Sequence, residues 1–105
     1  MSTWIPLTPL ETLADGTYER FECDHADVLV FREGNDVFAL EDRCTHDDTA
    51  LCGGYYFNGT IACPRHGAHF CIRTGEALSP PAYEATTVYP LRISEDGLIE
   101  ISFDA

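Results

Sequence analysis

The stretch NGTIACPRH, residues 58–66, joins a tight turn, a short apolar segment and a Cys-x-x-His pair. Asn-Gly between two apolar runs is the strongest short signal for a β-hairpin, so the stretch predicts strands over 55–57 and 60–62. Cys63 and His66 follow the second of these strands directly. The sequence therefore predicts a thiolate and an imidazole together on a loop at the end of a hairpin.

A second pair of the same kind, Cys44 and His46, lies upstream, and 16 residues separate the two pairs. Two cysteines and two histidines form either a tetrahedral zinc site or the ligand set of a [2Fe–2S] cluster with Cys₂ on one iron and His₂ on the other. Classical Cys₂His₂ zinc fingers place both cysteines before both histidines and carry the histidines on a helix. The order Cys, His, Cys, His makes zinc the weaker alternative, but the pairs alone leave both open.

Short strands separated by turn signals fill the rest of the chain. The expected strands are 18–23, 28–31, 37–40, 55–57, 60–62, 69–72, 76–78, 87–93 and 98–103. Thr8-Pro9-Leu10-Glu11 has the pattern of a capping box and predicts a short N-terminal helical turn that ends near Gly16. This spacing predicts an all-β fold, a small antiparallel sandwich or barrel with both ligand loops at one end. A chain of 105 residues is expected to form one domain, residues 1–105.

Composition limits the partners and the location of the protein. The net charge is −12 and lysine is absent, which argues against nucleic acid and anionic membranes as partners and favours a partner with a basic docking face. Residues 1–10 show no signal peptide, and no apolar run approaches the ~18 residues of a membrane span. A cytoplasmic protein is expected. Five cysteines, an odd number, indicate metal ligands and free thiols instead of a disulfide framework.

The ligand pairs and their surroundings resemble one family. Cys44-x-His46 and Cys63-x-x-His66, followed by Gly67, are similar to the Rieske [2Fe–2S] signature. Similarity to the stand-alone Rieske ferredoxins of bacterial aromatic-ring-hydroxylating dioxygenases extends over residues 42–46, 63–64, 66–67, 70, 73–75 and 79–81. The resemblance implies a Rieske-type antiparallel β-sandwich with one [2Fe–2S] cluster. It also implies that Cys44 and Cys63 bind the inner iron, and His46 and His66 the outer iron.

The resemblance further implies an electron carrier and not an enzyme, so no residue is assigned as catalytic. Such a protein passes single electrons from an NAD(P)H-dependent flavoprotein ferredoxin reductase to a terminal oxygenase in aromatic hydrocarbon catabolism, and it is expected to be a monomer. Two alternatives stay open: a small Rieske-type subunit of another redox enzyme, such as a nitrite-reductase-like system, and a zinc-stabilised interaction module.

The reduction potential follows from residues that the chain lacks. High-potential relatives carry an extra cysteine in each loop, together with Ser and Tyr hydroxyls that hydrogen-bond sulfur. The matching positions here hold Thr49, Arg65, Ala68 and Phe70. Fewer hydrogen bonds to sulfur stabilise the added electron less, which predicts the low end of the Rieske range, around ~−150 mV.

The remaining notable residues receive more ordinary interpretations. Ser79-Pro80-Pro81 resembles the proline-containing loop that covers the cluster in this family. Cys23, Cys52 and Cys71 are expected to be small buried apolar residues. His25 and His69 are expected not to bind metal.

Overall fold

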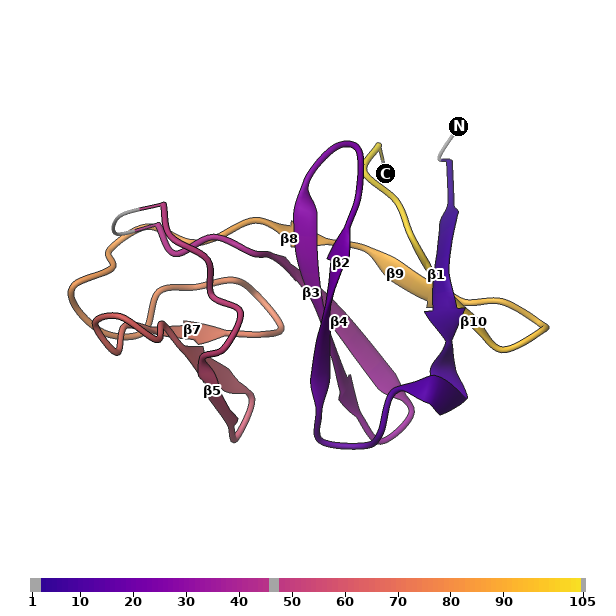
Figure 1. Cartoon of the computed structure of the whole chain (residues 1–105), viewed down its shortest axis with the longest axis horizontal. Coiled ribbons are helices and arrows are strands. Elements are labelled where there is room, and N and C mark those ends of the chain that lie inside the picture. The colour runs from indigo at the N-terminus through magenta and orange to yellow at the C-terminus, as the bar shows by residue number, and fades with distance from the viewer. Residues whose placement is uncertain (1–2, 46–47, 105) are drawn as a thin grey trace.

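The computed structural model describes residues 3–45 and 48–104, which form ten strands in three antiparallel sheets (Figure 1). The elements are β1 (Ile5–Pro9), the 3₁₀ helix η1 (Leu10–Thr12), β2 (Tyr18–Glu22), β3 (Asp27–Glu33), β4 (Asp36–Glu41), β5 (Tyr55–Phe57), β6 (Thr60–Ala62), β7 (His69–Cys71), β8 (Val88–Tyr89), β9 (Leu91–Ile93) and β10 (Leu98–Ile101). The predicted all-β antiparallel fold is confirmed. Within the described ranges, no helix is long and apolar enough to span a membrane.

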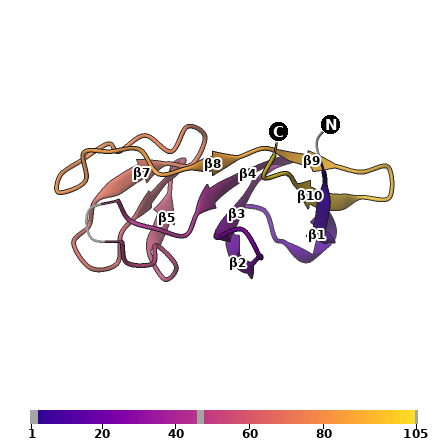
Figure 2. The same ribbon diagram turned by 90° about the horizontal axis from the view of Figure 1, so that it is seen from above.

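The three sheets follow one another along the molecule. Their strand orders are β1-β10-β9, β2-β3-β4-β8 and β5-β6-β7. Figures 1 and 2 show the sheet of β5–β7 at one end, the sheet of β1, β9 and β10 at the other, and β2–β4 between them. We call the sheets β1-β10-β9 and β2-β3-β4-β8 together the base.

Strand β3 is the centre of this arrangement. Side chains alternate between the two faces of a strand, so consecutive residues of β3 enter different cores. Leu29 and Phe31 belong to a core shared with the sheet of β5–β7, whereas Val28 and Val30 belong to a core shared with β10. All four side chains are fully buried, and each contributes about 1.5–3 kcal/mol. A strand buried on both faces must be a continuous apolar run, which is how the sequence predicted it.

The pairing of β4 with β8 brings the two predicted ligand loops to one end. Ala39 lies opposite Tyr89, and the Glu41 amide donates to the Thr87 carbonyl at 2.8 Å. Residues 42–87 therefore leave the base from β4 and return to it at the neighbouring strand β8. This long excursion carries β5, β6, β7 and both Cys–His segments.

The N-terminus differs from its prediction. The helical turn exists, but it is a single 3₁₀ turn whose N-cap, Pro9, has no side-chain hydrogen bond to it, so the predicted capping box is wrong. Thr8 instead belongs to the unpredicted strand β1, where it lies opposite Ile99 of β10. Prolines within a strand indicate an edge position, and β1 is an edge strand of its sheet.

Two later predictions also need correction. The predicted strand 87–93 divides into β8 and β9, because Pro90 between them has no amide to donate. The predicted strand 76–78 is reduced to one isolated bridge, between Phe70 and Ala77.

Candidate metal centre

Two loops with the same backbone hydrogen bonds carry the predicted cysteines. The Cys44 amide donates to the Thr49 carbonyl at 2.7 Å, and the Cys63 amide donates to the Ala68 carbonyl at 2.7 Å. In both loops the residue four places after the cysteine donates back to its carbonyl, at 2.8 Å from Asp48 and 2.9 Å from Gly67. The structure therefore places the two cysteines at equivalent positions of two matching loops.

Both cysteines face the interior. Cys44 is 0% exposed and Cys63 is 2% exposed, and both belong to the core that includes Leu51 and Phe70. Thiolates are soft ligands that suit iron–sulfur clusters. The apolar core around Cys44 and Cys63 is compatible with a cluster whose sulfur ligands lie on its inner side.

Of the two predicted histidine ligands, the structure describes His66. His66 is exposed, three residues after the buried Cys63. His46 lies outside the described residues. In the described ranges, no group of three or more His, Cys, Asp or Glu side chains is close enough together to hold a metal ion. The described part of the candidate site therefore has two buried cysteines and one exposed histidine.

Asp42 fixes the first loop and was not assigned this role from the sequence. Its side chain is 1% exposed. Oδ1 accepts the amides of Leu51 at 2.7 Å and Cys52 at 2.8 Å, and Oδ2 accepts from Arg20 Nε at 2.8 Å. One carboxylate thus ties the start of the loop to its end and to strand β2. No local pattern in the sequence marks this role, because the partners of Asp42 lie 9, 10 and 22 residues away along the chain.

The segment 78–84, which we call the proline strap, is hydrogen-bonded to the first loop and to the start of β7, directly after the second loop. Thr45, directly after Cys44, donates from Oγ1 to the Glu84 carbonyl at 2.6 Å. At the other end the His69 amide donates to Ser79 Oγ at 3.0 Å, and the Leu78 amide donates to the His69 carbonyl at 2.7 Å. These contacts support the predicted position of the Pro80-Pro81 segment beside the cysteine loops.

Residues 3–90 match the Rieske [2Fe-2S] domain family. The chain belongs to the Rieske [2Fe-2S] family. Cys44 and Cys63, which lie at equivalent positions of two matching loops, are both buried within the matched residues. The prediction of a Rieske protein is confirmed.

Relatives place this Rieske protein among the ferredoxins. It is 38% identical, over 89% of its length and 88% of the relative's, to the 3-phenylpropionate/cinnamic acid dioxygenase ferredoxin subunit of Photorhabdus laumondii. It is 32% identical, over 97% and 94% of the two lengths, to the anthranilate 1,2-dioxygenase ferredoxin subunit of Burkholderia cepacia. The prediction of an electron-transfer component, and not a catalytic one, is confirmed by these relatives.

Solved structures share the fold. A chain from the complex of reduced oxygenase and oxidized ferredoxin in carbazole 1,9a-dioxygenase superposes with a TM-score of 0.87 at 29% identity, covering 94% of this chain and 92% of that one. A putative NADH-dependent nitrite reductase small subunit from Mycobacterium tuberculosis superposes with a TM-score of 0.84 at 20% identity, over 100% and 98% of the two chains. The second likeness shows the fold alone.

The other three cysteines of the Rieske protein differ from one another. Cys52 is exposed, so the expectation of burial is wrong there: its amide is bound by Asp42 in a surface turn. Cys23 and Cys71 are half-buried. Burial raises the pKa of the Cys23 thiol above its ordinary value. Burial also raises that of Cys71, but hydrogen bonds from Thr74 and the backbone outweigh it, so the pKa of Cys71 is lowered.

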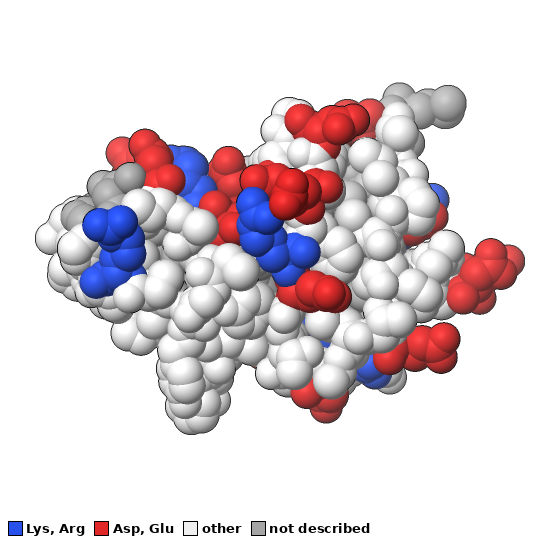
Figure 3. All heavy atoms as spheres, in the orientation of Figure 1, with Lys and Arg blue, Asp and Glu red and all other residues white. Residues whose placement is uncertain are grey.

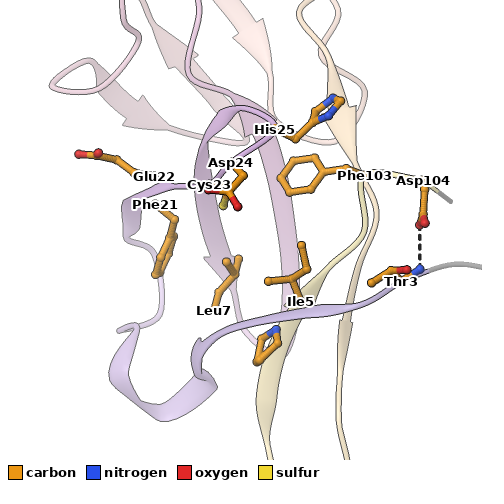
Figure 4. A pocket seen from close by; sticks show the side chains of 11 residues that line it. Thr3, Ile5, Leu7, Phe21, Glu22, Cys23, Asp24, His25, Phe103 and Asp104 are labelled. Carbon is orange, nitrogen blue, oxygen red and sulfur yellow. Dashed lines mark hydrogen bonds between the residues drawn. The ribbon is translucent and has the colours of Figure 1, made fainter.

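His25 lies in the base, away from β5–β7. Its ring stacks on Phe103 at 4.9 Å between centroids and meets the edge of Tyr89 at 6.2 Å. Figure 4 shows it at the rim of a pocket of about 730 Å³ that Ile5 and Leu7 of β1 also line. The pocket lies between the N-terminal strand and the C-terminal segment, and the candidate centre does not use it.

Proposed function

We propose that this Rieske protein is a cytoplasmic, low-potential one-electron carrier. It takes electrons from an NAD(P)H-dependent flavoprotein reductase and delivers them to the terminal oxygenase of a ring-hydroxylating dioxygenase. The ferredoxin subunits to which it is similar support this role. The observation that carries the proposal is the pair of matching loops, with cysteines buried inside and a histidine at the surface.

Four residues are proposed to hold the cluster: Cys44 and Cys63 on the inner iron, and His46 and His66 on the outer iron. When bound, a [2Fe–2S] cluster with this ligand set accepts and releases one electron at roughly −150 to +300 mV. The apolar core around Cys44 and Cys63 keeps water away from their sulfur atoms. The exposed imidazole of His66 gives a partner protein direct access to the outer side.

The low potential is supported by the residues next to the second loop. Ala68 and Phe70 occupy the positions where high-potential relatives carry hydroxyl groups, and both are 0% exposed. Neither side chain has a polar hydrogen to donate to sulfur. Loss of such hydrogen bonds lowers the potential, and we expect about −150 mV.

The proposal is tested with purified protein. We expect a red-brown protein whose reduced form gives an EPR signal with a low average g value. Cys44→Ser and His66→Ala should lose the signal, whereas His69→Ala, a matched change at a histidine outside the ligand set, should keep it. A colourless protein that binds one zinc ion and is EPR-silent would establish the zinc-stabilised alternative instead.

The partners need a separate measurement. Reduction of cytochrome c by a candidate flavoprotein reductase and NADH should depend on this protein, and the reduced protein should then drive turnover by a terminal oxygenase. Transfer only to a nitrite reductase would favour the alternative of a nitrite-reductase-like subunit, whose fold this chain shares.

We also propose that residues 1–105 form a single Rieske domain and act as a monomer, since a shuttle must present one end to two partners in turn. Light scattering of the purified protein tests this, and a stable dimer would contradict it.

A further inference from the structure

Tyr83 stands out on the proline strap. Its side chain is 83% exposed, more than any other large hydrophobic side chain in the described part of the chain. Tyrosine offers a large apolar area with a polar tip, and it loses little conformational entropy when it is fixed. An exposed tyrosine with these properties is typical of an anchor residue in a protein interface.

The structure anchors the backbone on both sides of Tyr83. Ala82, its neighbour, is 3% exposed and belongs to the core that contains both cysteines. The carbonyl of Glu84, on its other side, accepts from Thr45 Oγ1 at 2.6 Å. Tyr83 therefore projects from a backbone that is fastened on both sides, and one of the fasteners lies between the two ligands of the first loop.

The charges of the protein lie mostly elsewhere. Fourteen of the 18 acidic residues fall outside residues 44–87. Residues 49–64, which include β5, its turn and β6, carry no charged side chain. Figure 3 shows acidic side chains spread over the base, whereas the lobe that contains β5 at the lower left is uncharged on this face. Net charge alone favoured a basic docking face on the partner. Residues 44–87, however, hold four acidic residues and two arginines, which is −2 of the net charge of −12, although Asp48 and Glu84 are exposed at this end. A basic face would therefore be attracted to the base far more than to the cluster-bearing end.

We propose that Tyr83 is the anchor residue through which the cluster-bearing end binds the terminal oxygenase, by apolar contact and not by ion pairing. The inference rests on the proposed function, because it names the surface that the oxygenase contacts. Burial of an aromatic anchor at the centre of an interface gives affinity that depends little on salt, whereas attraction between opposite charges falls steeply as salt is added.

The test is electron transfer to a purified terminal oxygenase that the wild-type protein reduces. Tyr83→Ala should raise the KM for this protein about tenfold and leave kcat, the EPR signal and the reduction potential unchanged. Tyr83→Phe should stay within about twofold of wild type, since the apolar ring is retained. Raising NaCl from about 0.05 to about 0.3 M should change the wild-type KM by less than about twofold.

Tyr55→Ala is the matched control, because Tyr55 is 69% exposed but lies on β5 and not on the strap. A Tyr83→Ala variant with the wild-type KM, or an equal loss in Tyr55→Ala, would overturn the inference while the proposed function stands. If Tyr83→Ala slows only electron transfer from the reductase, the inference is overturned as well. If Tyr83→Ala raises the KM at the oxygenase step, the inference is supported, whether or not transfer from the reductase also slows. A wild-type protein that reduces no terminal oxygenase would overturn both proposals.

Discussion

The fifth position of each cysteine loop shows how single residues shape the site. Asp48 and Gly67 both adopt left-handed backbone conformations, with φ of 61° and 74°. Glycine does so at little cost, whereas aspartate is one of the few other residues that tolerate this region. Asp48 also pairs with Arg43 at 2.6 Å, an exposed contact. Two different residues thus satisfy one geometric requirement.

Gly75 is the residue at which a small change should do most damage. Its φ is +76°, and an added Cβ would collide with the Thr86 carbonyl. We expect Gly75→Ala to lower the free energy of unfolding by about 3 kcal/mol or more, because neither backbone segment can move freely. Gly97 has a similar φ of +82° with no atom within 4 Å of an added Cβ, so Gly97→Ala should cost only about 1–2 kcal/mol. Urea unfolding of both variants measures this difference, and equal losses would contradict the collision.

Sequence reasoning could propose the Cys–His pairs because each pair is local in the chain. It did not find the residues that hold the loops, since those contacts join distant positions. Arg20 and Asp42 are 22 residues apart, and Thr45 and Glu84 are 39 apart. No local sequence pattern predicts which polar side chain will bind which distant backbone group.

At the scale of elements, the same distinction separates successes from failures. Strands with clear alternation or Asn-Gly turns were predicted within a residue or two, such as β2 and β5. Strand β1 was missed because its prolines weaken the local signal, and only pairing with β10 makes it a strand. The 76–78 segment failed for the opposite reason, since its strand-like residues find just one bridging partner.

Asp42 is the element-scale test of the first cysteine loop. Asp42→Ala would leave the amides of Leu51 and Cys52 unpaired, and we expect a loss of about 3 kcal/mol in unfolding free energy together with weaker iron retention. Asp42→Asn keeps an acceptor oxygen and should recover most of this loss. Iron content and thermal unfolding measure both effects.

Glu22 supplies the matched control for Asp42, because it contacts the same Arg20 at 3.1 Å with a side chain that is 79% exposed. Glu22→Ala should leave stability and iron content unchanged, since exposed ion pairs contribute little. If Asp42→Ala behaved like Glu22→Ala, Asp42 would not be the residue that fixes the loop.

At the scale of the whole molecule, alkaline pH should weaken the fold. Burial, and next the hydrogen bond to Glu33 at 2.7 Å, raise the pKa of Tyr56 above its ordinary value of 10.0. Burial also raises the pKa of Tyr18 and of Tyr89. Above about pH 10 the unfolded chain loses these protons while the folded protein keeps them, so stability is complete below that pH and falls as pH rises.

Tyr56→Phe isolates one part of this effect. The variant lacks the hydrogen bond to Glu33, so its free energy of unfolding at pH 8 should be lower by about 1 kcal/mol. Above about pH 10 its stability should decline less steeply than that of the wild type. Denaturant unfolding at a series of alkaline pH values measures the slope. An unchanged slope would show that Tyr56 does not contribute to the alkaline loss.

Removal of the cluster should affect the two cores unequally. One core contains Cys44 and Cys63, whereas the core that includes Val30 and Ile99 contains neither. After iron is removed, we expect amide exchange to accelerate at least about tenfold in the cysteine loops and to change little in β9 and β10. Mass spectrometry of exchanged holo and apo protein compares the two regions, and a uniform acceleration would mean that the base depends on the metal.

The return of the chain from β4 to its neighbour β8 has a consequence for how such a protein can change. Two adjacent antiparallel strands are ordinarily the arms of a hairpin, and here the loop of that hairpin has grown to residues 42–87. Insertions between such arms cost little chain entropy, because closure grows only slowly with length. The base is therefore a scaffold on which residues 42–87 form an insertion that can be exchanged. Replacement of this insertion would give such a protein new chemistry while the scaffold stays unchanged.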